Sequence, residues 1–203
     1  MGSLRVSTAL AKKHGMLVTM DKCVEKFAGQ SARNEIMKGS EGISERTDKR
    51  RIAEFLQGAM GRMDGLVDEK VRTEIMENCG FECARQHRAM AQRALAKRRK
   101  FKTIDGYLDA EQRKPARGTK LIRKGDVLHQ IYTPLTYSKS MRCYCGLLRG
   151  LPPRETISPT YCQCSKGFVR KFWEGVLERP VRVELLRSAV SGAKECEFAI
   201  HLK

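Results

Sequence analysis

The sequence predicts an α+β fold with a largely antiparallel sheet. In the first half of the chain apolar residues recur at spacings of three and four, which is typical of helices, whereas two later regions alternate with a period of two, which is typical of strands. The order of helices, hairpin, helix and hairpin favours this class. With 203 residues, 41% hydrophobic and 31% charged, the chain can bury a sizeable core, which excludes fibrous, collagen-like and wholly disordered classes.

Residues 1–48 are predicted to form an N-terminal helical and linker segment, and residues 49–203 the main domain. The linker prediction rests on residues 29–47, which are polar and broken by glycines without a sustained period. From Lys49 onward, one apolar stripe predicts a helix that ends at Gly65.

Two further helices are predicted in the middle of the chain. Asp68 is placed to cap a helix that runs to about Asn78, and Gly80 stands where a left-handed residue commonly ends a helix. A third helix is expected to begin near Glu82, with its apolar residues on one face and arginines on the other.

The second half of the sequence predicts a hairpin, then a helix, then a second hairpin. Residues 120–123 and 127–132 alternate on either side of a turn that contains Gly125. Three prolines within residues 151–160 exclude regular structure there, and a helical stripe over 168–177 is stopped by a proline. Two closing strands, over 181–185 and 196–202, complete the expected sheet.

Six of the eight cysteines occur in local pairs, namely Cys79 with Cys83, Cys143 with Cys145, and Cys162 with Cys164. In an extended segment residues i and i+2 point the same way, so each Cys-x-Cys pair is expected to present both thiols toward one point. The other pair is expected at a helix junction, where the dipole of the following helix favours thiolates. A zinc ion or an iron–sulfur cluster usually takes four thiolates, and we expect it to be built from Cys143, Cys145, Cys162 and Cys164, with Cys79 and Cys83 adjacent. Because six thiols exceed four, either two of them serve another role or the cysteines bind more than one metal. Reactive or redox thiols, and inert buried thiols or disulfides, are the alternatives.

The remaining cysteines and one histidine receive separate interpretations. Cys23 and Cys196 are expected to be structural. His87 follows Cys83 by four residues on a predicted helix, so it is a candidate extra ligand or a base that activates a thiol. A partly buried structural histidine is the alternative.

Residues 161–168, which read Tyr-Cys-Gln-Cys-Ser-Lys-Gly-Phe, together with residues 179–184 and 192–198, resemble the vinyl-4-reductase domain and the related 2-amino-thiazoline-carboxylic acid hydrolase-like proteins. Residues 76–80, the first hairpin and the two Cys-x-Cys pairs are similar to an uncharacterised cysteine-rich bacterial and archaeal family. The resemblance covers residues 49–203. It implies the ligand-binding fold of haem nitric-oxide sensors and vesicle-tethering subunits, in which helices pack on a twisted antiparallel sheet around an apolar pocket.

The resemblance also implies a zinc site, but this chain lacks one of the cysteines that would form it. In vinyl-4-reductase domains zinc is typically held by cysteines near the C-terminal hairpin. One of these matches Cys196, and another falls where this chain has Ser188. The Cys-x-Cys pairs are therefore a separate candidate site, and the resemblance assigns no catalytic residue.

Positive charge is concentrated in one region. The formal net charge is +17, and residues 84–124 hold 14 Lys and Arg against three acids. The densest run is a basic patch that is expected to attract an anion, to contact nucleic-acid phosphates or to form a solvated surface. We define this basic patch as Arg98, Arg99, Lys100 and Lys102. No recognised nucleic-acid-binding motif accompanies it.

The sequence therefore predicts a cytoplasmic protein that binds an anionic or apolar small molecule beside a cysteine-ligated zinc ion or iron–sulfur cluster. Whether it is an enzyme stays open. No apolar run reaches the roughly 20 residues that a membrane helix needs. The alternatives are a non-enzymatic sensor or scaffold with structural zinc, and a basic nucleic-acid-associated protein. A homodimer is compatible with the sequence, which does not determine the oligomeric state.

Overall fold

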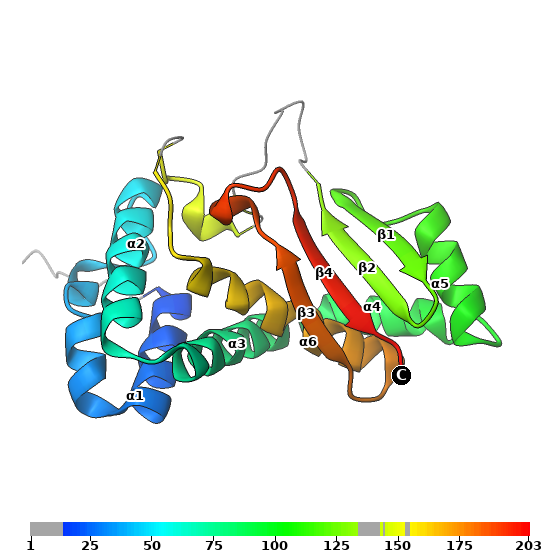
Figure 1. Ribbon diagram of the computed structural model, residues 1–203, viewed down its shortest axis with the longest axis horizontal. Coiled ribbons are helices and arrows are strands. Elements are labelled where there is room, and N and C mark those ends of the chain that lie inside the picture. Colours follow the sequence, from blue (N-terminus) through cyan, green and yellow to red (C-terminus); the bar gives the residue numbers. More distant parts are fainter. Residues whose placement is uncertain (1–13, 134–142, 144, 153–154) are drawn as a thin grey trace, which may run out of the picture.

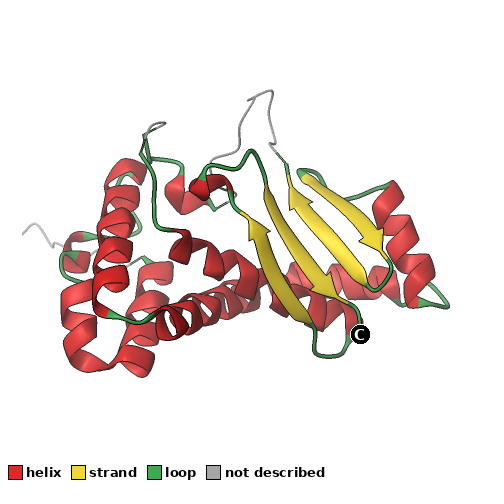
Figure 2. Ribbon diagram, viewed as in Figure 1, coloured by secondary structure: helices red, strands yellow, loops and turns green. Residues whose placement is uncertain are grey.

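The molecule consists of a helical part and a part built around a sheet (Figures 1 and 2). The computed structural model describes residues 14–133, 143, 145–152 and 155–203. Helices α3 and α6 lie alongside each other and connect the two parts (Figure 1). The helices are α1 Gly15–Ile36, α2 Lys49–Leu66, α3 Glu69–Gln86, α4 Arg88–Arg98, α5 Ile104–Arg113 and α6 Gln163–Leu177, and the strands are β1 Thr119–Lys124, β2 Val127–Tyr132, β3 Arg182–Arg187 and β4 Cys196–His201.

The sheet is antiparallel throughout, with strand order β1-β2-β4-β3. Gly125 has a φ of +58° in the turn between β1 and β2, a conformation that favours glycine. Leu128, Ile200 and Val183 lie side by side on β2, β4 and β3, and they pack with Trp173 of α6 in one hydrophobic cluster. Helices on one face of an antiparallel sheet confirm the predicted α+β class.

The N-terminal segment packs into a second hydrophobic cluster, so the linker prediction for residues 29–47 is wrong. Helix α1 continues to Ile36 after a kink at Gly29, and Ile36, Met37 and Ile43 are at most 3% exposed. Arg62 of α2 donates a hydrogen bond to the carbonyl oxygen of Ile36 at 2.9 Å. Ile36, Met37 and Ile43 show no helical period in the sequence. They nevertheless hold this polar segment in place, because they pack against apolar residues of α2 and α3.

Helix α3 is continuous over 69–86, so the helix end predicted at Asn78 and the helix start predicted at Glu82 are wrong. Gly80 lies inside the helix, not at a left-handed terminus. A Cβ at Gly80 would overlap the carbonyl oxygen of Cys164 and lie 2.7 Å from the amide nitrogen of Phe168 on α6. The glycine is required by the close approach of α6.

A second glycine completes this contact between α3 and α6. A Cβ at Gly167 would overlap the carbonyl oxygen of Glu77 on α3. Lys166 and Arg170 of α6 flank the contact and pair with the Glu77 carboxylate at 2.5 and 3.9 Å. The two helix backbones therefore touch directly, and the ion pairs lie beside this contact.

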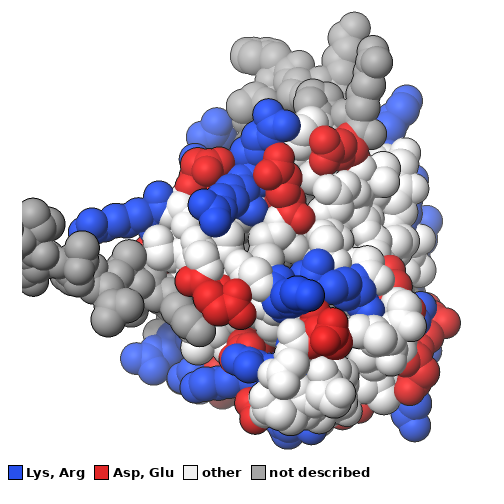
Figure 3. All heavy atoms as spheres, turned by 90° about the vertical axis from the view of Figure 1, so that its left-hand side faces the viewer, with Lys and Arg blue, Asp and Glu red and all other residues white. Residues whose placement is uncertain are grey.

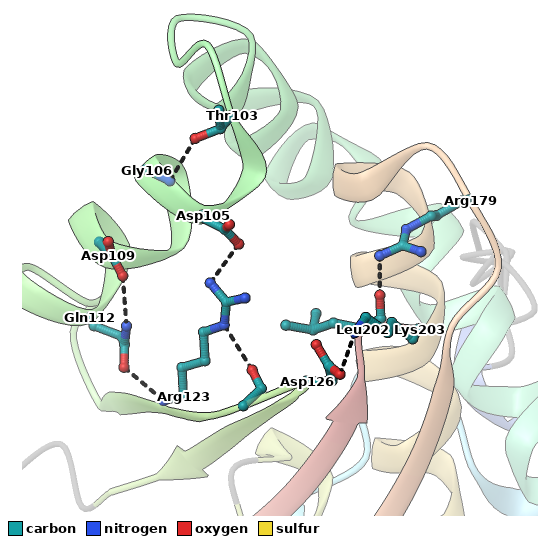
Figure 4. Close-up of polar contacts among 11 residues, drawn as sticks. Thr103, Asp105, Gly106, Asp109, Gln112, Arg123, Asp126, Arg179, Leu202 and Lys203 are labelled. Atoms are coloured by element: carbon teal, nitrogen blue, oxygen red, sulfur yellow. Dashed lines mark hydrogen bonds and ion pairs between the residues drawn. The ribbon is translucent and has the colours of Figure 1, made fainter.

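Helix α5 was not predicted from the sequence, and contacts with β1 hold it in place (Figure 4). The Thr103 hydroxyl accepts a hydrogen bond from the amide of Gly106 and caps the helix. The Gln112 carbonyl accepts from the amide of Arg123 at 2.6 Å, and the Arg123 guanidinium pairs with Asp105 at 2.6 Å. These partners lie on β1, so the local sequence pattern of residues 104–113 does not reveal them.

No helix in the described part of the chain is long and apolar enough to cross a membrane.

The sheet face opposite the helices carries an ion-pair network that makes stability depend on pH. The Glu197 carboxylate, 13% exposed, pairs with His129 at 2.8 Å and with Arg187 at 2.5 Å. Burial alone would raise the pKa of Glu197, but hydrogen bonds from His129 and Arg187 outweigh it and lower the pKa. Because the folded state has the lower pKa, this contribution is complete above the unfolded pKa of about 4.3 and is lost as the pH falls through the folded value.

We expect Glu197→Gln to lower the free energy of unfolding at pH 7 by about 1–3 kcal/mol, because two charge-assisted hydrogen bonds are lost. Urea unfolding at pH 7, 5 and 3 measures this, and the difference from the wild type should shrink at the lowest pH. Glu184→Gln is the matched control, since Glu184 also pairs with a histidine and an arginine but is 44% exposed. Its cost should stay below about 1 kcal/mol. An equal loss at every pH would contradict the role of Glu197.

Candidate metal centre

Four of the six predicted cysteine ligands lie in one region, between the C-terminal half of α3 and the first turn of α6. Cys83 is on α3, Cys164 is on α6, and Cys143 and Cys145 immediately precede a short 3-10 helix over 146–148. The Cys145 sulfur lies 3.3 Å from the buried hydroxyl of Tyr161. The Cys143 sulfur accepts a hydrogen bond from the amide of Cys145 at 3.3 Å.

The pKa values of these thiols reflect their proximity. Burial raises the pKa of Cys164 well above that of an ordinary thiol, and thiolates at Cys145, Cys83, Cys143 and Cys162 would raise it further. Burial also raises the pKa of Cys143 and of Cys83, and a thiolate at Cys145 adds to both. Because each negative charge opposes the next, a cation is needed to hold several of these groups as thiolates. A divalent metal stabilises the thiolates that it coordinates.

The four thiols are not already arranged around a metal position. Among residues 14–133, 143, 145–152 and 155–203, no three His, Cys, Asp or Glu side chains are placed to hold a metal ion. A tetrahedral zinc site needs sulfur atoms about 2.3 Å from the metal, so the thiols would have to draw together. Cys143 and Cys145 lie outside helices and strands, so a shift there would disrupt little regular structure.

The second Cys-x-Cys pair is helical, and its two thiols diverge. Helix α6 begins at Gln163 and not near Phe168, and Cys162 already has helical dihedral angles of −73° and −14°. Side chains two residues apart on a helix point about 200° apart. The expectation that Cys162 and Cys164 present both thiols to one point is therefore wrong.

Cys162 instead directs its thiol to a buried hydroxyl at the end of β3. Its sulfur lies 2.7 Å from the hydroxyl of Ser188, which is 4% exposed. Burial raises the pKa of Cys162 to about 12, although the hydrogen bond with Ser188 opposes the shift. Cys196, buried as predicted, accepts a hydrogen bond from the amide of Ala189 at 3.3 Å. The resemblance implies a zinc-binding cysteine at position 188. This chain instead has Ser188, whose hydroxyl forms a hydrogen bond with the Cys162 thiol.

Cys79 and Cys23 of α1 are both buried in one hydrophobic cluster. Interaction with the other thiol raises the pKa of Cys79, which is 1% exposed, and lowers that of Cys23. Both Cys79 and Cys83 lie in the C-terminal half of α3, where the helix dipole disfavours an anion. The expectation that a helix N-terminus stabilises their thiolates is therefore wrong.

His87 lies at the junction of α3 and α4 and is exposed. Its Nδ1 is 2.9 Å from the carbonyl oxygen of Cys83 and 3.9 Å from the sulfur of the same residue. A carbonyl oxygen only accepts, so Nδ1 carries the proton and donates it to the backbone. This nitrogen therefore serves the helix junction and is not positioned as a base for the Cys83 thiol.

The basic patch lies far from the cysteines. It occupies the end of α4 and the following turn, where Arg99 pairs with Glu178 at 2.6 Å. Glu178 follows the last turn of α6, whereas Cys164 is in the first turn, so about 20 Å of helix separates them. On the side where α1 and α2 lie, Lys and Arg groups are interspersed with Asp and Glu groups (Figure 3).

Two surface cavities lie beside α3 and α6, and charged side chains contribute to the lining of both. One lies against β3 and includes Glu77, Lys166 and Arg182, and the other lies between α1, α3 and α6. Neither has the character of the apolar pocket that the resemblance implies.

Comparisons with solved structures find H-NOX proteins from Shewanella oneidensis. One, described in the Fe(II)NO ligation state, is 13% identical, with 93% of this chain and 97% of that chain covered at a TM-score of 0.44. Another, an NMR structure of an H-NOX domain in the Fe(II)CO ligation state, is also 13% identical, with 93% and 98% covered at a TM-score of 0.47. At these values the likeness supports no inference about a ligand.

Sequence comparisons give one clear assignment. A search of curated proteins finds no match. A family model matches residues 17–203, which include all six paired cysteines, Cys23 and Cys196. The chain therefore belongs to DUF6144, a family of unknown function.

Proposed function

We propose that Cys83, Cys143, Cys145 and Cys164 bind a thiophilic metal, as a zinc ion or an iron–sulfur cluster, in a small-molecule-binding protein. The observation that carries this proposal is that thiols from α3, from α6 and from Cys143 and Cys145 gather in one region, where the Cys145 sulfur lies 3.3 Å from the Tyr161 hydroxyl just before α6. Thiolates at these positions and at Cys162 would raise the pKa of Cys164. Cys162 is left out of the set because its sulfur contacts Ser188. Four thiolates are the ligand set of many structural zinc sites and of common iron–sulfur clusters.

Tyr161 supports this assignment as a neighbour of the ligands. Its hydroxyl, 3.3 Å from the Cys145 sulfur, is placed to donate a hydrogen bond to a thiolate. The preceding Thr160 donates a hydrogen bond to Asp64 of α2 at 2.7 Å and so holds this turn in place. Hydrogen bonds of this kind commonly orient metal ligands.

The direct test is the metal content of protein purified without oxygen, measured by elemental analysis together with a visible absorption spectrum. Stoichiometric zinc without colour supports a zinc ion, and iron with visible absorbance supports a cluster. Cys164→Ser is expected to remove most of the metal. Cys196→Ser is the matched control, because Cys196 is a buried cysteine outside the proposed set, and it should retain the metal. Metal-free wild-type protein, or unchanged metal in Cys164→Ser, would contradict the proposal.

Metal binding should also stabilise the fold, because the folded chain brings the thiols together and the unfolded chain does not. For a zinc site, a free zinc concentration of a hundred times Kd is expected to raise the free energy of unfolding by about 2.7 kcal/mol. Thermal unfolding of chelated protein with and without added zinc measures this effect. The stabilisation should be absent in Cys164→Ser and present in Cys196→Ser. Equal stabilisation of both variants would place the metal elsewhere.

A structural zinc in a non-enzymatic sensor or scaffold is the second candidate. Four protein thiolates fill the coordination of a zinc ion and leave no open position for a substrate. This ligand set therefore favours a structural over a catalytic role if the metal is zinc.

A further inference from the structure

Helix α4 is the one α-helix in the described part of the chain that contains no Asp or Glu. It lies beside α6, behind the sheet in the view of Figure 1. Between Glu82 and Asp105 the sequence has no acid and has eight basic residues, namely Arg85, Arg88, Arg93, Lys97, Arg98, Arg99, Lys100 and Lys102. Positive charge is therefore concentrated along α4 and the turn that follows it.

Helix α4 packs against the protein with small side chains and leaves its other side open to solvent. A Cβ at Gly175 of α6 would lie 3.5 Å from the Ala91 methyl group, and Ala94 packs against the hydrophobic cluster around Trp173. No residue of α4 is buried. The opposite face is exposed and carries Ala89, Gln92, Arg93, Ala96 and Lys97. This face of α4 is therefore accessible to a partner.

Ion pairs with the rest of the protein neutralise only part of the charge in this region. Lys97 pairs with Glu111 of α5 at 2.5 Å, and Arg99 pairs with Glu178 at 2.6 Å. Four exposed cations take part in no ion pair with any described residue, and we call them the α4 cations: Arg88, Arg93, Lys100 and Lys102. Around α1 and α2, in contrast, basic and acidic groups are interspersed (Figure 3).

The spacing of the α4 cations fits a polymeric anion better than a small one. Helix α4 has 11 residues and is therefore about 16 Å long. The α4 cations occupy its first turn, its middle and the turn after its end, so one small anion cannot contact all of them. A nucleic-acid duplex carries one negative charge per about 1.7 Å of its axis, so a row of phosphates can do so.

The uncharged side chains of α4 disfavour two other polymeric partners. A helix that lies on a membrane inserts large apolar side chains, whereas the exposed face of α4 has alanines, with Met90 at its edge 45% exposed. Single-stranded nucleic acid is commonly held by aromatic rings that stack on its bases. Phe101 is partly buried and packs edge-on against Tyr107 at 5.8 Å, so it is not free to stack.

We propose that the exposed face of α4 and the α4 cations bind the phosphate backbone of double-stranded nucleic acid without regard to base sequence. The small side chains of Ala89 and Ala96 let the duplex approach the helix closely. Binding of each phosphate by a cation releases a counterion, so the affinity falls steeply with salt. None of the proposed metal ligands takes part, so this inference is independent of the metal site.

The test measures binding of the full chain, as purified, to a fluorescein-labelled DNA duplex of about 20 base pairs by fluorescence anisotropy. If the four α4 cations each contact a phosphate, a rise in salt from about 50 to 200 mM should weaken binding by about 150-fold. An RNA duplex of the same length tests the second source of paired phosphates. A binding constant that does not change with salt, or tighter binding of the single strand than of either duplex, would overturn the proposal.

A triple variant, Arg93→Gln, Lys100→Gln, Lys102→Gln, tests the assignment to this surface. Its three side chains are exposed and form no ion pair with a described residue, so the fold should be retained, as circular dichroism can verify. One α4 cation remains, so the same rise in salt should weaken binding only about fourfold, and the affinity at the lowest salt should be lower than that of the wild type.

The matched control is Lys38→Gln, Lys49→Gln, Lys70→Gln, which removes the same charge from exposed lysines near α1, α2 and α3. It should bind the duplex nearly as well as the wild type. Equal losses in the two triple variants would show that net charge alone attracts the duplex and would refute the role of α4. Sedimentation with phosphatidylserine vesicles gives the membrane comparison, and a chain that binds these vesicles but not the duplex would also overturn the proposal.

Discussion

Replacing Gly80 by alanine is expected to destabilise the protein by about 3 kcal/mol or more, at the upper end of overpacking effects. The added Cβ would overlap the backbone of Cys164, and backbone atoms cannot rotate aside as a flexible side chain does. Helices α3 and α6 would have to separate, which also moves Cys83 away from Cys164. Urea unfolding followed by circular dichroism measures the loss, and the proposed metal should be retained less well.

Gly61→Ala is the matched control for this variant. Gly61 also lies inside a helix, α2, but nothing lies within 4 Å of a Cβ placed there. The change should stabilise the protein by about 0.5–1 kcal/mol, because alanine has the higher helix propensity. If both variants had the same effect, the contact between α3 and α6 would not be the reason for Gly80.

Trp173→Ala is the second change with a large expected effect, a loss of roughly 3–5 kcal/mol. Trp173 is 2% exposed between α6 and the sheet, and its indole N–H donates to the side-chain oxygen of Gln130 at 2.7 Å. Its removal leaves both a cavity and a buried acceptor without its donor. Circular dichroism in urea is the appropriate measurement, since Trp173 is the single tryptophan of the chain and its fluorescence is lost.

Two further variants separate the contributions at this position. Trp173→Phe keeps an aromatic ring but leaves Gln130 unpaired, so it should cost about 1–3 kcal/mol. Phe172→Ala, one position earlier on α6 and only partly buried, should cost less than Trp173→Ala. A larger loss for Phe172→Ala would mean that the indole does not anchor the sheet to α6.

The elements with a strong hydrophobic period were predictable. The stripe that begins at Lys49, the hairpin around Gly125 and the last two strands appear as expected, because each pattern states locally which face is buried. Helix α5 and the buried residues Ile36 and Ile43 were not predictable. They are fixed by partners distant in sequence, on β1 and α2, which no window of local residues contains.

The glycines show why local rules failed at the centre of the molecule. Gly80 fits the pattern of a helix terminus, and the sequence alone offers no sign that a second helix passes over it. The structure resolves the ambiguity, since the carbonyl of Cys164 occupies the space that a side chain would need.

What the sequence determined by itself was the class of the fold, the number of thiols and the chemistry open to them. Spacing along the chain did not decide which thiols meet. The helical start of α6 turned the Cys162 and Cys164 thiols in different directions, and tertiary packing brought Cys79 near Cys23 and brought Cys83, Cys143 and Cys145 near Cys164. Thiols from separate stretches meet only through tertiary packing, so the ligand set was decided by the contact of α3 with α6 and by the placement of Cys143 and Cys145 beside it. The relation to vinyl-4-reductase domains stays a prediction.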